Sequence, residues 1–266
     1  MSASFVSEDE VTHPLSFSSS AVVLPSSSSS GNLPTCFGES ITPKTTFSFE
    51  RYLTASVWDN SRGLAYVFGG VASRTLFDQI LKYNPVSDSI SLSPRQLITP
   101  RYGIASAWDP VNKIAYLIGG KDSSSATAAP LPDIFTYDPA SESLTPKPSL
   151  PFSVFGASAV YFNNKVYIFG GYNGSYINLV LVYDIATNTV NFVTDGGGTP
   201  ITFPSGRFGS TATLDPTTNL IYIFFGYNGA PLNDIFVFNP SNNSLSPVTL
   251  SAGSVPVSPR YIASSF

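Results

Sequence analysis

Residues 101–139 read RYGIASAWDPVNKIAYLIGGKDSSSATAAPLPDIFTYDP, and this stretch decides the fold. It holds a short segment of small residues, a turn, an apolar segment ending in Gly119-Gly120, a polar loop and a third segment closed by Tyr137-Asp138-Pro139. Val, Ile, Phe and Tyr favour a pleated, half-buried surface, and Asp-Pro pairs mark turns. A glycine pair after a buried strand lets the backbone turn and approach a neighbour. The stretch therefore predicts a unit of short antiparallel strands.

Three landmarks of this stretch recur at intervals of 50 to 54 residues, which is the period of propeller blades or solenoid units. The first is an arginine or its substitute, at Arg51, Arg101, Ser153, Arg207 and Arg260. The second is an apolar run closed by a glycine pair, at residues 65–70, 115–120 and 166–171; in the fourth copy Phe225 replaces the first glycine. The third is an Asp or Asn followed by an apolar segment, an aromatic residue and a turn, beginning at Asp78, Asp133, Asn178 and Asp234.

Four complete copies of short strands at fixed spacing, without helical periodicity, predict an all-β propeller with four-stranded antiparallel blades. We name the strands of each repeat a to d in chain order. The repeats run over about 51–100, 101–152, 153–206 and 207–259, and a partial strand occupies 260–266.

These residues resemble the kelch repeat family, the galactose oxidase-like β-propellers. The resemblance rests on the glycine pairs at 69–70, 119–120 and 170–171 and covers residues 39–266, with downstream aromatics at Tyr83, Tyr137, Tyr183 and Phe238. The tryptophan that the family usually carries in its last strand is absent. Apolar residues replace it: Ile90, Leu144, Val190 or Phe192, and Leu245.

The two ends of the chain predict an incomplete blade. Residues 1–38 form a Ser-rich segment that can bury little apolar surface, so we expect a disordered tail. Residues 39–44 match residues 142–147, so the propeller begins on a d strand, and it finishes on an a strand at 260–266. Pairing the two would give a composite fifth blade without open edges. Because residues 14–38 contain no glycine pair, we favour instead a truncated blade in a piece of a longer protein.

Composition limits the partners. The formal charge of −4 and the pI near 4.9 give no basic surface, so we expect no nucleic-acid binding. No apolar run approaches a membrane span, and we expect no direct membrane insertion by this chain. A single cysteine, Cys36, excludes an internal disulfide framework. A complete chain would be cytoplasmic and a fragment of a secreted or membrane protein extracellular, where Asn173 and Asn242 would be glycosylation acceptors.

Strand alternation predicts one face that carries both the starts of the a strands and the b–c loops. Arginine and tyrosine are enriched in recognition surfaces, so this face is the candidate binding site. The candidate residues are Arg51, Arg101, Tyr102, Arg207, Phe208, Arg260, Lys121, Tyr172 and Tyr227. The alternative is structural: each arginine pairs with a neighbouring blade's carboxylate or stacks on its aromatic residue.

Catalytic chemistry finds little support in the repeats. Copper radical oxidation, which the resemblance would imply, needs two His, two Tyr and a crosslinked Cys, yet the chain has only His13 and Cys36, both before the first repeat. Asp9 and His13 make a D-x-x-x-H pair faintly similar to an iron motif of plant kelch specifier proteins, and we interpret it as coincidence. The sequence predicts no catalytic, metal or cofactor site.

Acid-base chemistry by carboxylates remains an alternative, with Asp78, Asp122, Asp133 and Asp234 as candidates. Three of them recur at one repeat position, which indicates a structural role, capping a turn through bonds to backbone N–H groups. We therefore favour a non-catalytic protein-binding scaffold. The alternative is a carbohydrate-binding or carbohydrate-handling galactose oxidase-like ectodomain.

Overall fold

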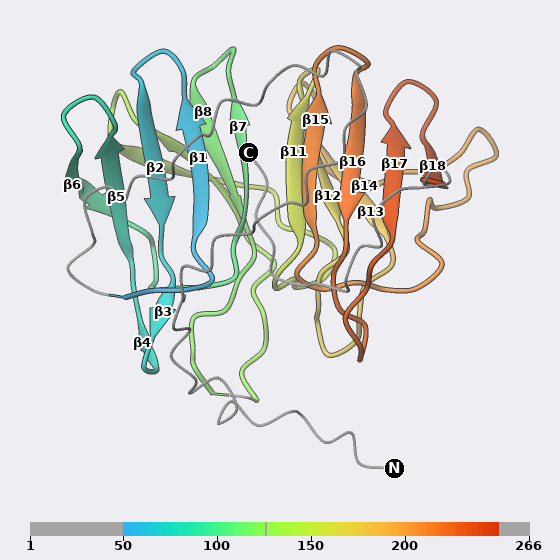
Figure 1. Ribbon diagram of the computed structural model, residues 1–266, viewed down its shortest axis with the longest axis horizontal. Helices are drawn as coiled ribbons and strands as arrows, with labels where there is room; N and C mark the ends of the chain where they lie inside the picture. The colour runs from blue at the N-terminus through green and yellow to red at the C-terminus, as the bar shows by residue number, and fades with distance from the viewer. Residues whose placement is uncertain (1–49, 126, 250–266) are drawn as a thin grey trace, which may run out of the picture. The chain divides into compact units, whose positions relative to one another are not determined.

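A computed structural model describes residues 50–125 and 127–249. These residues form four four-stranded antiparallel sheets, here called blades 1 to 4, and one two-stranded ribbon (Figure 1). No helix occurs within the described ranges. The all-β expectation and the predicted four-stranded units are confirmed.

Each blade is built from strands that follow one another in the chain. Blade 1 contains β1 (Ala55–Asp59), β2 (Leu64–Phe68), β5 (Gln79–Asn84) and β6 (Ser89–Gln96), with the ribbon β3 (Val71–Ala72) and β4 (Thr75–Leu76) in its b–c loop. Blade 2 contains β7 (Ala105–Asp109), β8 (Ile114–Ile118), β9 (Ile134–Asp138) and β10 (Ser143–Lys147). Blade 3 contains β11 (Ser158–Phe162), β12 (Lys165–Phe169), β13 (Val180–Asp184) and β14 (Thr189–Phe192). Blade 4 contains β15 (Thr211–Asp215), β16 (Leu220–Phe224), β17 (Ile235–Asn239) and β18 (Ser244–Pro247).

The turns between strands follow from the Asp and Asn residues that the sequence places there. In the a–b turn of blade 2, the carboxylate of Asp109 accepts the N–H groups of Val111 at 2.9 Å and Asn112 at 3.0 Å. In the c–d turn of the same blade, Asp138 accepts the N–H of Ala140 at 2.8 Å. Such bonds to a side chain replace the backbone hydrogen bonds between strands at the point where the chain reverses.

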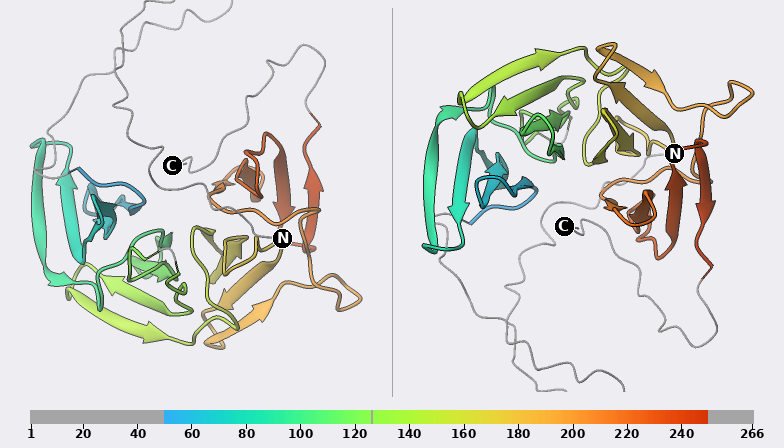
Figure 2. Two further views of the ribbon diagram at one scale, coloured as in Figure 1. Left: turned by 90° about the horizontal axis from the view of Figure 1, so that it is seen from below. Right: turned by 90° about the horizontal axis from the view of Figure 1, so that it is seen from above.

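The a strands of successive blades lie next to one another. β1 contacts β7, β7 contacts β11, and β11 contacts β15. Figure 2 shows the four blades following one another around a central axis with these strands innermost. The small residues of β7, Ala105 and Ala107, are buried there. The prediction that the a strands are the innermost strands is confirmed (Figure 2).

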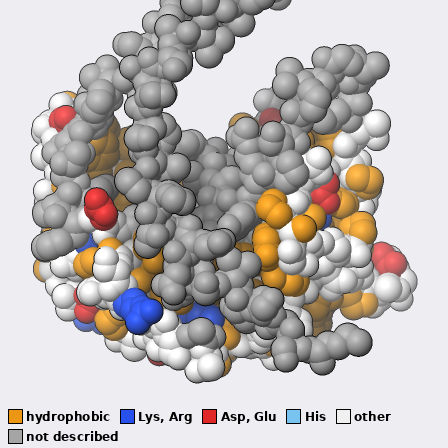
Figure 3. Space-filling view, turned by 60° about the horizontal axis from the view of Figure 1, so that its bottom comes forward, with side chains coloured by type: hydrophobic (Ala, Val, Ile, Leu, Met, Phe, Trp, Pro, Cys, Tyr) orange, Lys and Arg blue, Asp and Glu red, His pale blue; other side chains and the backbone are white. Residues whose placement is uncertain are grey.

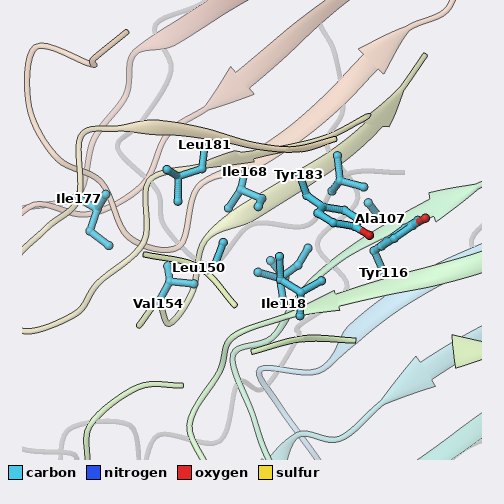
Figure 4. Packing of buried hydrophobic residues seen from close by; sticks show 12 residues of the cluster. Ala107, Tyr116, Ile118, Leu150, Val154, Ile168, Ile177, Leu181 and Tyr183 are labelled. Carbon is cyan, nitrogen blue, oxygen red and sulfur yellow. The ribbon is translucent and has the colours of Figure 1, made fainter. Parts of the chain in front are cut away.

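The hydrophobic core lies between the blades. At the junction of blades 2 and 3, Tyr116 and Ile118 of β8 pack in one cluster with Ile168 of β12 and Leu181 of β13 (Figure 4). Strand residues alternate between the two faces of a sheet, so each middle strand buries one set of side chains against each neighbouring blade. Burying an aliphatic side chain contributes about 1.5–3 kcal/mol, so these interfaces hold the fold together.

Several sequence-based expectations lie outside the described residues. They are the tail at 1–38 with Asp9, His13 and Cys36, the entering strand at 39–44, and the partial strand at 260–266 with Arg260. The composite or truncated fifth blade therefore stays a prediction.

Candidate functional site

The arginine-led segments and the b–c loops meet on one side of the blades, which we call the loop face. Backbone hydrogen bonds join them in each repeat: Tyr102 exchanges two with Lys121, at 3.1 and 3.0 Å, and Phe208 exchanges two with Tyr227, at 2.9 and 2.8 Å. Phe155 and Tyr172 are paired in the same way in blade 3. Hydrophobic side chains lie exposed on this side among isolated charged ones (Figure 3).

Two of the predicted arginines are buried, and each forms an ion pair with an aspartate. Arg207 is fully buried, and its guanidinium forms a two-pronged bond to Asp234 with distances of 2.9 and 3.1 Å. Arg101 donates to Asp133 at 2.8 Å. Both carboxylates belong to the arginine's own blade, not to a neighbouring one, because each precedes the c strand of that blade. The geometry favours the structural interpretation of these arginines. The expected partner was a carboxylate of a neighbouring blade, and the observed partner is a carboxylate of the same blade.

The backbones of Arg101 and Arg207 form hydrogen bonds to the preceding blade. The N–H of Arg101 donates to the carbonyl of Phe77 at 3.1 Å, and its carbonyl accepts from Gly70 at 2.9 Å. A single residue therefore fastens blade 1 by its backbone and blade 2 by its side chain. This arrangement holds adjacent blades in register, as the structural alternative expected.

The structure corrects the predicted role of the recurring aspartates. Asp133 and Asp234 do not cap turns through their carboxylates; they face guanidinium groups. In blade 1 the equivalent residue is Gln79, one position after Asp78, and it accepts from Arg51 at 2.6 Å. Arg51 also lies over the ring of Phe77, and burial lowers its pKa. A neutral amide thus replaces the carboxylate in this copy.

The third repeat has an apolar version of the same pair. Its arginine position is Val154, not Ser153, because the carbonyl of Val154 accepts from Gly120 as that of Arg101 accepts from Gly70. The partner position is Leu179, which packs against the cluster that contains Val154. The prediction that Ser153 replaces the arginine was therefore wrong by one residue.

An aromatic row follows the arginine position around the axis. The rings of Tyr102 and Phe155 lie 5.2 Å apart edge to face, and those of Phe155 and Phe208 are stacked at 5.2 Å. Lys121 places its ammonium group 5.3 Å from the centre of the Phe155 ring. The predicted residues Tyr102, Phe208 and Lys121 are thus brought together, mainly as packing between blades.

A tyrosine cluster in the b–c loops of blades 3 and 4 forms the accessible part of the site. The Tyr176 ring lies 5.3 Å from that of Tyr172 and 5.8 Å from that of Tyr227. Burial, followed by the two neighbouring phenols, raises the pKa of Tyr176, so it stays a neutral donor and acceptor. Sequence reasoning named Tyr172 and Tyr227 and missed Tyr176, which is 37% exposed. Its single occurrence among the repeats gave no signal.

Both glycosylation sequons lie in exposed loops. Asn173 is exposed next to the tyrosine cluster, and its side chain accepts the N–H of Ser175 at 3.2 Å. Asn242 is exposed in the c–d turn of blade 4. A glycan on Asn173 would lie on the loop face, whereas one on Asn242 would not.

Metal-ligating groups are scattered over the described chain. Between residues 50 and 249, apart from residue 126, no three His, Cys, Asp or Glu side chains gather closely enough to hold a metal ion. Across the same described ranges, no helix is long and apolar enough to cross a membrane.

Comparison with known proteins identifies the family. The KLHDC2/KLHL20/DRC7 Kelch-repeats domain matches residues 52–266. A Kelch repeat-containing protein of Dictyostelium discoideum is 25% identical over 215 residues, 72% of this chain and 32% of the relative, so the chain spans about a third of that relative's length. The solved structure of YjhT is similar in fold, with a TM-score of 0.58 and 18% identity over 70% of this chain and 62% of that one. The chain belongs to the Kelch-repeat family of β-propellers.

Proposed function

We propose that this chain is a non-catalytic scaffold that binds a protein partner through its loop face. Kelch-repeat domains generally mediate protein–protein interaction, which supports the scaffold role. The observation that carries the choice of face is the cluster of Tyr172, Tyr176 and Tyr227. Tyrosine supplies a large rigid contact area with a polar tip, and such residues dominate the energy of protein interfaces.

The predicted arginines take a supporting part in this proposal. Arg207 fastens Asp234 and the carbonyl of Phe225, at 3.0 Å, which fixes both ends of the blade 4 b–c loop. Arg101 contacts Asp133 and the carbonyl of Gly119 in blade 2. Loops held in this way lose little conformational entropy on binding, which raises affinity. The tyrosines make the contact, and Arg207 positions the blade 4 loop that presents Tyr227.

The experiment compares three forms of the full chain: the wild type, Tyr176→Ser, and the matched control Val111→Ser. Val111 is 74% exposed in the a–b turn of blade 2, which lies on the opposite side from the loop face. Affinity capture with quantitative mass spectrometry identifies proteins retained by each form, and calorimetry then measures the dissociation constant with the purified partner. We expect Tyr176→Ser to weaken binding about tenfold or more and Val111→Ser to leave it unchanged.

Equal binding by all three forms would contradict the assignment of the loop face. The alternative function, carbohydrate binding, draws on the same cluster, because an exposed tyrosine offers a flat apolar ring with a hydrogen-bonding tip. A glycan-array signal that Tyr176→Ser abolishes, without any retained protein, would favour that alternative.

A further inference from the structure

Blade 4 has one sheet face that differs from its counterparts in the other blades. In blades 1 to 3, the b and c strands turn a set of side chains toward the following blade, and all of these side chains are buried. They are Tyr66, Phe68 and Ile80; Tyr116, Ile118 and Ile134; and Tyr167, Phe169 and Val180. The equivalent residues of blade 4, by strand register, are Tyr222, Phe224 and Ile235, and these are only half-buried. The described residues contain no sheet that follows blade 4.

The chain itself carries a segment with the sequence that this face requires. Arg260-Tyr261 stands 53 residues after Arg207-Phe208, which lead blade 4. Counted from the leading arginine, Ser264, Ser265 and Phe266 stand where β7 has Ala105, Ser106 and Ala107, so the first two positions are small in both segments. The inner strand of a blade needs small side chains because neighbouring blades converge at the axis. Residues 260–266 therefore have the pattern of an inner strand.

One side chain makes the junction after blade 4 different from the other three. In blades 1 to 3 the first glycine of the pair lies against the carbonyl oxygen of the residue that leads the next blade. A Cβ atom on Gly69, Gly119 or Gly170 would lie only 2.2, 2.2 or 2.5 Å from the carbonyl oxygen of Arg101, Val154 or Arg207, respectively. Blade 4 has Phe225 at this position, with a φ of 61° close to the 58–64° of the three glycines. Its Cβ atom occupies the space that the next carbonyl would need.

We propose that residues 260–266 of this chain dock on the half-buried face of blade 4 as the inner strand of a fifth blade, and that the Cβ atom of Phe225 holds their backbone farther from blade 4 than in the other junctions. This inference concerns how the propeller continues and is independent of the proposed binding function. A covalently attached segment has a high effective concentration at a nearby surface, which favours it over a second copy of the chain. The junction after blade 4 would then be the loosest of the four.

The blade 3 to blade 4 junction supplies the template for a disulfide test. There, the hydroxyl oxygens of Ser158 and Ser210 lie 3.4 Å apart. The pair 53 residues further along the chain is Thr211 and Ala263. A disulfide needs the two Cβ atoms about 3.5–4.5 Å apart, so two cysteines at such positions report docking directly. The full chain carrying Cys36→Ser, Thr211→Cys and Ala263→Cys is oxidised, digested and mapped by mass spectrometry.

We expect an intramolecular disulfide between positions 211 and 263, formed more slowly than the disulfide of a Ser158→Cys/Ser210→Cys reference protein in the same Cys36→Ser background. The control Thr211→Cys/Ser264→Cys should give none, because successive residues of a strand point to opposite faces. A reference disulfide without the 211–263 disulfide would overturn the proposal. A disulfide found only between two molecules would also overturn it and would assign the face to a second copy.

Two further variants isolate the role of Phe225. Phe225→Gly removes the Cβ atom and should speed formation of the 211–263 disulfide several-fold, toward the rate of the reference pair. Phe225→Ala removes the ring but keeps the Cβ atom, so the disulfide should form at the same rate as in the 211–263 protein that retains Phe225. Equal acceleration by both variants would show that the ring, and not the Cβ atom, limits the approach, and would overturn this part of the proposal.

Discussion

At the scale of single residues, the position that leads each blade forms three kinds of side-chain pair: Arg with Gln, Arg with Asp, and Val with Leu. The residue that leads each blade is opposed by the residue that precedes the c strand, and the pairs are Arg51 with Gln79, Arg101 with Asp133, Val154 with Leu179, and Arg207 with Asp234. At Arg101, Val154 and Arg207 the backbone bonds to the preceding blade whatever the side chain is, so the side chain at this position can vary. Buried ion pairs offset a large desolvation cost, and an apolar pair of similar volume is often as stable.

If an apolar pair can replace the ion pair at this position, a double-mutant cycle in blade 4 should show it. Arg207→Ala should lower the free energy of unfolding by about 2 kcal/mol, less than for a fully buried pair because the side chain of Asp234 is 39% exposed and can be hydrated. Replacing both residues, as Arg207→Val with Asp234→Leu, copies blade 3 and should recover most of that loss. Urea unfolding followed by fluorescence measures both changes. A double variant no more stable than Arg207→Ala would contradict the equivalence of the two pair types.

At the scale of strands and turns, Glu142 fastens blade 2 to blade 1. It lies in the c–d turn of blade 2, and its carboxylate accepts from Lys82 at 2.8 Å, from Tyr137 of its own blade at 2.5 Å and from Ser93. Burial alone would raise the pKa of Glu142, but the hydrogen bonds from Lys82, Ser93 and Tyr137 outweigh it and lower the pKa below its ordinary value of 4.5. Burial raises the pKa of Tyr137, and its hydrogen bond to Glu142 raises it further.

The lowered pKa of Glu142 predicts a pH dependence of stability. A carboxyl group with a lower pKa in the folded chain contributes its full stabilisation above pH 4.5 and loses it as the pH falls through the folded-state pKa. Glu142→Gln should therefore be less stable than the wild type at pH 7, by about 1 kcal/mol for a partly exposed ion pair. The difference should shrink below pH 4.5. Thermal unfolding of both proteins between pH 3 and 7 tests this, and a difference that grows toward low pH would contradict it.

At the scale of the propeller, the blades share interfaces instead of a single central core. The row formed by Tyr102, Phe155 and Phe208 crosses two of these interfaces on the loop face. Close approach is possible because Gly103 and Gly156 have no Cβ: one added to Gly103 would lie 2.0 Å from the Phe155 ring. Phe155 therefore couples blades 2, 3 and 4.

Removal of this coupling should affect more than one blade. Phe155→Ala should cost about 3 kcal/mol, as is usual for a buried phenylalanine. It should also speed amide hydrogen exchange in the segments leading blades 2 and 4. Tyr52, the member of the same series in blade 1, is 59% exposed, and Tyr52→Ala should change stability by less than about 0.5 kcal/mol. Exchange confined to blade 3 in the Phe155→Ala protein would show that the row does not transmit stability.

The fold was predictable because its signals repeat. Glycine pairs, Asp turns and apolar runs recur in phase, and an error in one copy is corrected by the others. The site was predictable only in part, because it depends on single positions. The third repeat has no arginine at its leading position, so the sequence pattern indicated Ser153 where the structure has Val154, and Gln79 in place of Asp78 hides the partner of Arg51. Tyr176 has no counterpart elsewhere and so left no pattern in the sequence.

The sequence by itself determined the all-β class, the number of clear repeats and, in three of the four repeats, which residue leads the blade, because short-range turn chemistry and strand alternation are local properties of the chain. The tertiary structure alone decided that Arg101 and Arg207 face inward onto carboxylates, while Tyr176 lies against Tyr172 and Tyr227 at the surface. Those outcomes depend on how closely neighbouring blades and loops approach each other, a distance set by packing across segments far apart in the chain.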